Sequence, residues 1–320
     1  MLSVRTVPDV PDATDALGGL TILQRGWLSS NNVLIHGTQD EPGAWLIDTG
    51  HACHAEQTIA LVDQALAGLP LAGILNTHLH NDHCGGNAAL QRHFGLRPWV
   101  PQSRWQAVQQ WDMDRLGHSA IGHDCPRFDA GGALAPGESL RAGGRDWLAL
   151  AAPGHDPDSL VLFEPQHRVL ISADALWHNG FGLVFPELIG EPGFADVAAT
   201  LDMIEALDAR CVIPGHGAPF TDVGAALGRA RSKLAYFQAE PERHARHAIK
   251  ALLKYRLMEL RREPLAALVT WAQAAPWLQG VIATGAARQN CTAAHWCETV
   301  VGELVAAGQL SLDSGIVSDA

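Results

Sequence analysis

The sequence of 320 residues lacks any apolar run that approaches the ~20 residues a membrane-spanning helix needs. Its six cysteines are scattered and form no CxxC pair, so the pattern does not indicate a disulfide scaffold. Residues 1–11 contain no basic segment followed by an apolar core, so no secretory signal is predicted. These absences predict a soluble, cytoplasmic protein with no membrane partner.

Positive charge is also scarce, because 22 Lys and Arg oppose 34 Asp and Glu for a formal net charge of −12. Phosphate contacts require positive charge, so the balance argues against nucleic-acid binding by the chain as a whole. From residue 240 onward eight basic and eight acidic residues cancel. Residues 1–239, called the body below, therefore carry the whole net charge of −12.

A histidine cluster stands out in the run THLHNDH, residues 77–83. Clustered imidazoles repel one another when protonated and need partners when buried. Neutral imidazole and carboxylate are standard ligands for zinc and its first-row neighbours, so the run predicts a metal site. A solvated or purely structural histidine cluster is the alternative. The apolar residues 71–76 predict a buried strand before the run, and residues 88–93 predict a helix after it.

Three further segments repeat one pattern, an apolar strand followed by a sharp turn and one potential ligand. His155 follows the apolar residues 147–152, and His216 follows residues 211–213. Asp174 follows the strand-like residues 168–171. Ligands at the carboxyl ends of several strands would lie where α/β folds commonly place their sites.

With these motifs the sequence resembles the metallo-β-lactamase fold superfamily of binuclear metal hydrolases, over about residues 19–220. The likeness includes the segment LIDTG, residues 46–50, which in this family precedes the loop that carries the first metal ligands. That loop corresponds here to residues 77–83 and is called the metal loop below. It implies two divalent ions per chain, zinc first and manganese or iron as alternatives. It further implies that His78, His80 and His155 hold the first ion, that Asp82, His83 and His216 hold the second, that Asp174 bridges them, and that Asp48 orients the metal loop.

Alternating short strands and helices up to about residue 220 predict a layered α/β fold. The resemblance implies an αββα sandwich with the metals at one edge. The elements predicted individually are strands at 32–36 and 44–48, a hairpin of 160–163 and 168–172, and helices at 55–66 and 194–206.

After residue 240 the composition favours helices, at 244–260, 264–274 and 293–307, followed by a hairpin near 308–315. This arrangement resembles a winged helix, and residues 250–260 are similar to the C-terminal domain of the β-lactamase-like protein 2 group. We therefore expect a catalytic domain at 1–238 and a small helical domain at 239–320. The basic stripe on the first of these helices is expected to be solvated or to dock on the acidic body rather than to bind phosphates; its members are Arg243, Arg246, Lys250 and Lys254.

Two loop segments are expected near the site. In the loop after Asp174, Trp177, His178 and Phe181 are expected to contact substrate. Residues 101–125 are expected to form a partly helical insert near the site mouth. In that insert, Trp105 and Trp111 are expected to pack onto the body, and His118 and His123 to be surface or structural residues.

The ligand set implies hydrolysis by a metal-bridging hydroxide, with Asp82 orienting the nucleophile and taking up its proton. The acidic body and the aromatic loop favour a small-molecule ester or thioester as substrate. Glutathione thioesters are less favoured, because Lys233 and Tyr236 do not align with the basic and tyrosine positions of glutathione-binding family members. The alternatives are a ribonuclease or other phosphodiesterase, a non-catalytic signalling protein that retains the fold, and a one-iron sulfur dioxygenase. A homodimer remains open.

Overall fold

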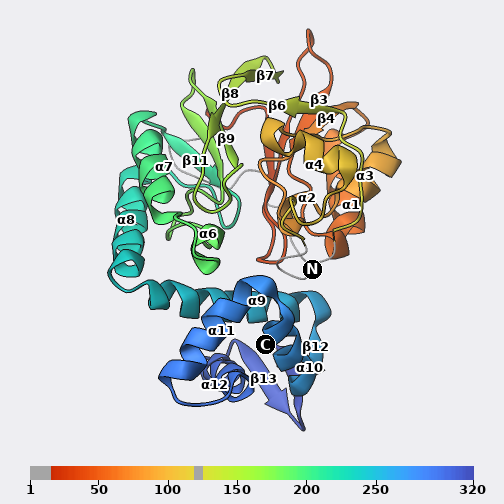
Figure 1. Ribbon diagram of the computed structural model, residues 1–320. Helices are drawn as coiled ribbons and strands as arrows, with labels where there is room; N and C mark the ends of the chain where they lie inside the picture. The colour runs from red at the N-terminus through yellow and green to blue at the C-terminus, as the bar shows by residue number, and fades with distance from the viewer. Residues whose placement is uncertain (1–15, 119–124) are drawn as a thin grey trace.

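A computed structural model describes residues 16–118 and 125–320, and it shows two facing β-sheets covered by helices, with a further helical layer beneath them (Figure 1). The expectation for His123 falls outside the described residues. The αββα arrangement expected from the sequence is confirmed.

The first sheet contains six strands in the order β1 to β6. Neighbouring strands are antiparallel from β1 to β3 and parallel from β3 to β6. The strands are β1 Leu20–Leu23, β2 Asn32–Ile35, β3 Ala44–Ile47, β4 Leu71–Leu75, β5 Trp99–Pro101 and β6 Gly132–Leu134. Helices α1 (Ala55–Leu66) and α3 (Asn87–Phe94) cover its outer face, where Ile59 and Val62 pack on the sheet.

The second sheet has the order β11-β10-β9-β8-β7, antiparallel except for the parallel pair of β10 and β11. Its strands are β7 Ser139–Ala142, β8 Arg145–Ala151, β9 Leu160–Glu164, β10 Val169–Ala173 and β11 Cys211–Pro214. Helices α7 (Phe194–Ala206) and α8 (Val223–Ala239) cover its outer face. The predicted hairpin and the helix at 194–206 are thus confirmed.

Short elements at the carboxyl ends of these strands form one edge of the sandwich. They are η1 Ala52–His54, α2 Asn81–Cys84, η2 Gln102–Arg104, α4 Trp105–Gln110 and α6 Phe185–Leu188. The predicted ligand segments leave the ends of β4, β8, β10 and β11, so the fold gathers them at this edge.

The C-terminal segment contains one more helix than the sequence predicts, because residues 276–288 also form a helix. Its elements are α9 Pro241–Leu260, β12 Arg262–Pro264, α10 Leu265–Ala274, α11 Pro276–Arg288, α12 Ala293–Ala306, β13 Leu310–Asp313 and β14 Ile316–Asp319. The three strands form a small sheet in the order β12-β14-β13. The signal for α11 is weak because Gly280 and Gly285 interrupt its apolar residues, yet Gly285 is where the ring of Trp296 packs closely.

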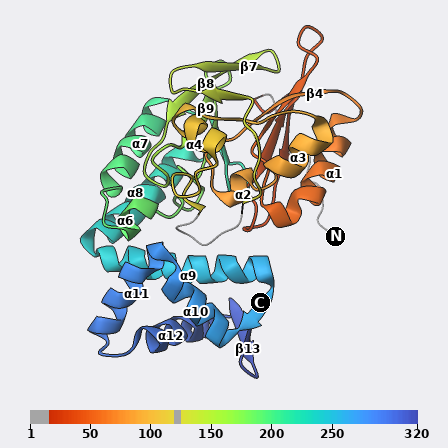
Figure 2. The same ribbon diagram turned by 45° about the vertical axis from the view of Figure 1, so that its right-hand side comes forward.

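The C-terminal helices bury a core that includes Leu253, Leu268 and Val300, and Phe185 and Leu188 of α6 pack into it. Helix α9 runs beneath both halves of the sandwich, below the edge that carries α2 and α6 (Figures 1 and 2). The C-terminal segment therefore lies against the edge where the predicted ligands gather.

None of the described helices is by itself long and apolar enough to cross a membrane. One pair of neighbouring helical segments reaches the required length and apolar composition only when taken together, and the two segments are bent by 103° relative to each other. They are residues 265–274 and 276–285.

Trp147 fills the space between the two sheets and is fully buried. Its Nε1 has no hydrogen-bond partner among the described residues, so the side chain contributes through packing alone. We predict that Trp147→Ala lowers the free energy of unfolding by about 3–5 kcal/mol, because it leaves a large cavity. Trp147→Phe should cost clearly less, since it keeps a ring and removes no hydrogen bond. Urea denaturation of both variants measures the difference, and equal stability of Trp147→Ala and the parent would contradict this packing role.

Candidate metal centre

Three histidine rings meet at the end of β4. The Nε2 of His78 lies 3.0 Å from Nδ1 of His80, which in turn lies 2.8 Å from Nε2 of His155. All three residues are buried. Burial, together with the neighbouring imidazoles, lowers the pKa of His78 and His80 well below the usual value. These two rings are therefore neutral, and nitrogen lone pairs converge on one point, which is the requirement of a bound cation.

A second group lies beside the first and contains Asp82, His83, Asp174 and His216, with ligand atoms within 4.8 Å of one another. The Nε2 of His216 lies 3.0 Å from Oδ2 of Asp82. The Nε2 of His83 is fully buried and has no hydrogen-bond partner among the described residues. Its nearest polar neighbours are the carboxylates of Asp174 and Asp82, 3.3 Å and 3.8 Å away, and a buried ring nitrogen that faces carboxylates in this way suits a metal ligand.

Asp174 stands between the two groups. Its Oδ2 lies 3.3 Å from Nε2 of His155, and its Oδ1 lies 3.3 Å from Nε2 of His83. The indole Nε1–H of Trp177 donates to Oδ1 over 3.2 Å. Close packing fixes this carboxylate, because a Cβ at Gly215 would lie 2.3 Å from Oδ1. The two carboxylate oxygens therefore face different groups, as a bridging ligand requires.

Asp48 holds the loop that carries the ligands. Its carboxylate accepts hydrogen bonds from the backbone N–H of Thr77 at 2.8 Å, from the Thr77 hydroxyl at 2.8 Å and from Nδ1–H of His83 at 2.7 Å. In the other group, Nδ1–H of His155 donates to the Leu183 carbonyl at 2.6 Å. These bonds place the proton of each ring on Nδ1, which leaves Nε2 free to bind a metal.

Negative charge is concentrated around His83. Burial alone would lower the pKa of this ring, but the carboxylates of Asp48, Asp174 and Asp82 outweigh it and raise the pKa well above the usual value. In the same way, His83 and His216 hold the pKa of both Asp82 and Asp174 below the usual value, although burial alone would raise it. Buried carboxylates that remain ionised next to imidazoles suit a site for positive charge.

The donor set fits divalent metal ions, which the fold also implies. Imidazole nitrogen and carboxylate oxygen bind zinc, manganese and iron alike, so these donors do not determine the identity of the metal.

A cleft of about 430 Å³ opens over the two groups, and much of its wall was not predicted from the sequence. Trp27, which is 59% exposed, stacks on the ring of His216 with centroids 5.3 Å apart. Helix α9 contributes Leu252, Tyr255 and Met258 to the opposite wall. The Tyr255 hydroxyl donates to Oδ1 of Asn81 in the metal loop over 2.9 Å.

Of the three substrate-contacting residues predicted after Asp174, the structure brings only Trp177 to the cleft. His178 is instead exposed and lies 3.0 Å from Asp222. Phe181 is 1% exposed, in the core beneath α8, with the ammonium group of Lys233 over its ring. Sequence position alone does not separate these roles, because residues close together in a loop can point in opposite directions.

The predicted insert packs against the metal loop. Trp105 and Trp111 are partly buried against a cluster that includes Leu79 and Phe128, in agreement with the expected packing role. Arg104 pairs with Asp156 at 3.1 Å, and Asp156 in turn lies 3.7 Å from Nε2 of His80. The insert therefore reaches the ligand region through an ion pair.

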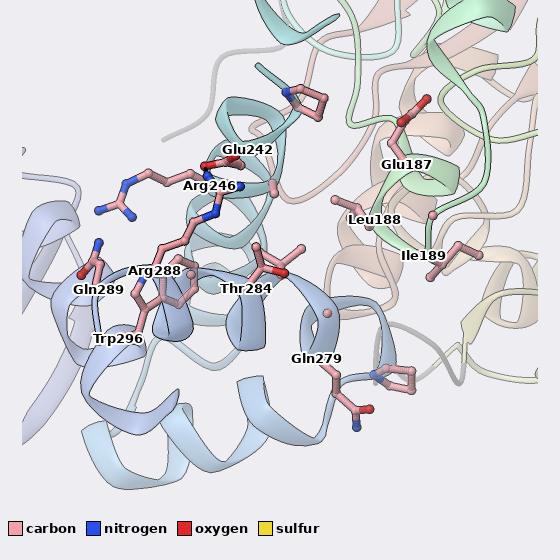
Figure 3. A pocket seen from close by; sticks show the side chains of 17 residues that line it. Glu187, Leu188, Ile189, Glu242, Arg246, Gln279, Thr284, Arg288, Gln289 and Trp296 are labelled. Carbon is pink, nitrogen blue, oxygen red and sulfur yellow. Dashed lines mark ion pairs between the residues drawn. The ribbon is translucent and has the colours of Figure 1, made fainter. Parts of the chain in front are cut away.

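A larger cavity of about 730 Å³ lies away from the metal centre, between α6, α9 and α11 (Figure 3). Its arginines are already paired, Arg288 with Glu242 and Arg246 with Glu303, and Glu187 accepts hydrogen bonds from two backbone N–H groups. The groups of potential metal ligands among the described residues lie elsewhere. We therefore assign the chemistry to the smaller cleft.

A family model of the metallo-beta-lactamase superfamily matches residues 25–216, which include every ligand motif described above. The chain belongs to the metallo-β-lactamase superfamily. Together with the intact ligand groups, this membership identifies a metal-dependent hydrolase.

Two curated relatives of this superfamily member are named as hydroxyacylglutathione hydrolases. The chain is 28% identical over 193 residues to hydroxyacylglutathione hydrolase GloC of Haemophilus influenzae, which covers 58% of this chain and 84% of that protein. It is 33% identical over 171 residues to a hydroxyacylglutathione hydrolase of Dechloromonas aromatica, covering 53% of this chain and 52% of that one. The chain thus spans only about half the length of the second relative.

A metallo-beta-lactamase family protein of Thermus thermophilus shares the fold of nearly the whole chain. The two structures match over 95% of this chain and 100% of that one, with a TM-score of 0.54 and 20% identity. The shared fold therefore extends through the C-terminal helices, beyond the segment that the family model matches.

The contacts of Asp48 lead to a prediction about metal affinity. Asp48→Asn should keep the fold but weaken metal binding by about 10- to 100-fold, because it removes the charged partner that orients His83. Competition with a chromophoric chelator measures this affinity directly. Asp40→Asn is the matched control, since Asp40 is exposed and distant from the ligands, and it should bind metal as the parent does. Unchanged affinity in Asp48→Asn would show that Asp48 does not orient the site.

Proposed function

We propose that this protein hydrolyses small-molecule esters or thioesters at a binuclear metal centre. The observation that carries the proposal is the position of Asp174, whose two oxygens face two ligand groups at the floor of a largely apolar cleft. Such an arrangement is suited to a pair of ions that act together on one bond.

The first ion would be held by His78, His80 and His155, and the second by Asp82, His83 and His216, with Asp174 shared. Zinc is our first choice, and manganese or iron would suit the same donors. When bound, such a pair supplies Lewis acidity that lowers the pKa of water and polarises an acyl oxygen.

The side chains of the chain itself orient and protect this chemistry. Asp82 is ionised and lies at the cleft, so its carboxylate can orient the attacking water and take up a proton from it. Trp177 and Gly215 hold Asp174 in place, and the Leu183 carbonyl holds His155. Ligands that are already oriented need little reorganisation during the reaction.

The walls of the cleft favour an apolar substrate. Trp27 and Trp177 form one side, with ring centroids 5.4 Å apart, and Phe185 and Met258 lie on other walls. The ammonium group of Lys254 is the basic group on this lining, and it donates to the Gln309 carbonyl and to Asp319. An uncharged acyl group would therefore lose little hydration energy on entering the cleft.

The names of the two curated relatives support a thioester as the scissile bond, but the lining differs from what a glutathione carrier needs. Glutathione has two carboxylates, and the one lysine on the described lining of the cleft already contacts Asp319. We propose a carrier thiol or alcohol with less negative charge.

The ribonuclease alternative would require a basic surface near the cleft. The stripe on α9 is instead engaged within the C-terminal segment, because Arg246 and Lys250 pair with Glu303 and Lys254 pairs with Asp319. These pairs weaken the case for phosphate contacts. They also differ from the expected docking on the acidic body, since both partners belong to the C-terminal segment.

We predict that the metal-loaded protein hydrolyses apolar acyl thioesters or esters faster than glutathione thioesters, phosphodiesters or single-stranded RNA.

Asp174→Ala should remove most of this activity and lower the metal content from about two ions per chain, because it deletes the shared ligand. Asp82→Asn should keep the fold but slow turnover. A rate panel with elemental analysis tests these statements. Parent-like turnover in both variants would contradict a binuclear mechanism, and preferential cleavage of RNA would favour the alternative.

We predict that Trp27→Ala raises KM for esters with large apolar acyl groups by about 5- to 30-fold, because the exposed indole forms a wall of the cleft. The value of kcat should change less, since the residue does not contact the reacting bond in this arrangement. Tyr236→Ala is the matched control, because Tyr236 is a similarly exposed aromatic residue, 51% exposed, outside the cleft lining. Equal KM values for the two variants would show that Trp27 does not bind substrate.

A further inference from the structure

A second set of potential metal ligands lies behind the metal loop and takes no part in the proposed reaction. It contains Cys84, His118 and Cys125, whose ligand atoms all lie within 4.8 Å of one another. The three residues are 0%, 2% and 6% exposed, respectively. Cys84 ends α2, next to the ligand His83, while His118 and Cys125 belong to the insert.

We propose that these three residues bind a soft divalent metal ion, with zinc as the natural occupant, at a structural site distinct from the catalytic pair. The two sulfur atoms lie 3.7 Å apart. Two thiolates on a tetrahedral zinc ion, each about 2.3 Å from the metal, would be separated by about 3.8 Å. The sulfur positions therefore already suit a shared ion.

His118 provides the second observation. Its Nε2 is buried and has no hydrogen-bond partner among the described residues. The residues around it form an apolar cluster that includes Leu79, Val108 and Phe128. An aliphatic side chain would pack there as well as a histidine does, so packing alone does not account for the imidazole. A metal ion would satisfy the imidazole, as buried polar groups usually require.

Charge also favours a dication bound to these residues. Two cysteine thiolates balance the charge of a zinc ion, so the complete site is neutral and can remain in apolar surroundings. Hard cations such as magnesium and calcium prefer oxygen, whereas thiolate and imidazole select zinc and similar ions. Three protein ligands leave the fourth position to a small molecule such as water.

A disulfide between the two cysteines is the competing explanation. It would require the sulfur atoms to approach to about 2.05 Å, and it would remove the Cys125 thiol as the hydrogen-bond partner of His118. The metal accounts for all three side chains. It would also explain how the insert is attached to the helix that carries Asp82 and His83.

Cobalt(II) substitution tests this site independently of activity. The seven residues of the catalytic centre supply only nitrogen and oxygen, so a thiolate-to-cobalt charge-transfer band in the near ultraviolet reports cysteine ligation outside that centre. Loss of the band in Cys53→Ser would place it instead at the more exposed group of His51, Cys53 and Glu259, and would contradict the proposal. We expect the reduced, cobalt-loaded parent to show this band, and the zinc-loaded parent to show sulfur neighbours at about 2.3 Å by X-ray absorption.

Cys125→Ser and His118→Gln are the test variants, because neither residue is adjacent in sequence to a catalytic ligand. Cys125→Ser should lose the band and about one equivalent of metal, and His118→Gln should bind this ion more weakly. Cys297→Ser is the matched control, since Cys297 is equally buried but lies in α12, and it should behave as the parent.

Three further results would overturn the proposal. The first is a reduced, cobalt-loaded parent without the band, which decides the matter even if a variant fails to fold. The second is a band that persists in Cys125→Ser. The third is a Cys84–Cys125 disulfide in protein purified without air, combined with no sulfur-bound cobalt after reduction.

Discussion

The arrangement of the whole catalytic edge depends on the carboxylate of Asp174 and its position between two groups of imidazoles. Burying this charge is costly without compensation, and the compensation comes from three different strand ends. His83 follows β4, His155 follows β8 and His216 follows β11. The two sheets must therefore meet at one edge for the carboxylate to be stable, and the apolar core around Trp147 is what holds them there.

The C-terminal segment completes the cleft by the same kind of charge compensation. Lys254 sits on the cleft lining, but Asp319 and the Gln309 carbonyl take up its donors, so the wall presents mainly apolar surface. In addition, Tyr255 reaches Asn81 in the metal loop. Helix α9 thus has one face that packs into the C-terminal core and another that covers the catalytic edge. The segment therefore forms one wall of the cleft above the two groups of potential ligands.

The grouping of the potential ligands was predictable from the sequence, because His78 to His83 lie within one loop and each later candidate follows an apolar strand. The walls of the cleft were not. Trp27 is an isolated tryptophan in a loop, and Met258 belongs to an apolar helix face that looks the same whether it meets a core or a cleft. Phe181 shows the opposite error, since this aromatic residue in the loop after Asp174 is part of the core.

The insert between β5 and β6 is where local sequence was least informative, because its contacts join residues far apart in the chain. Arg104 reaches Asp156, 52 residues away, and Cys84 meets Cys125, 41 residues away. No short motif encodes such pairs. Both contacts nevertheless adjoin the metal loop. Asp156, the partner of Arg104, lies near His80, and Cys84, the partner of Cys125, follows His83 in the chain. The loop is therefore supported from two sides by the same insert. Its rigidity depends on how the insert is anchored as well as on Asp48, which holds the loop from the strand side.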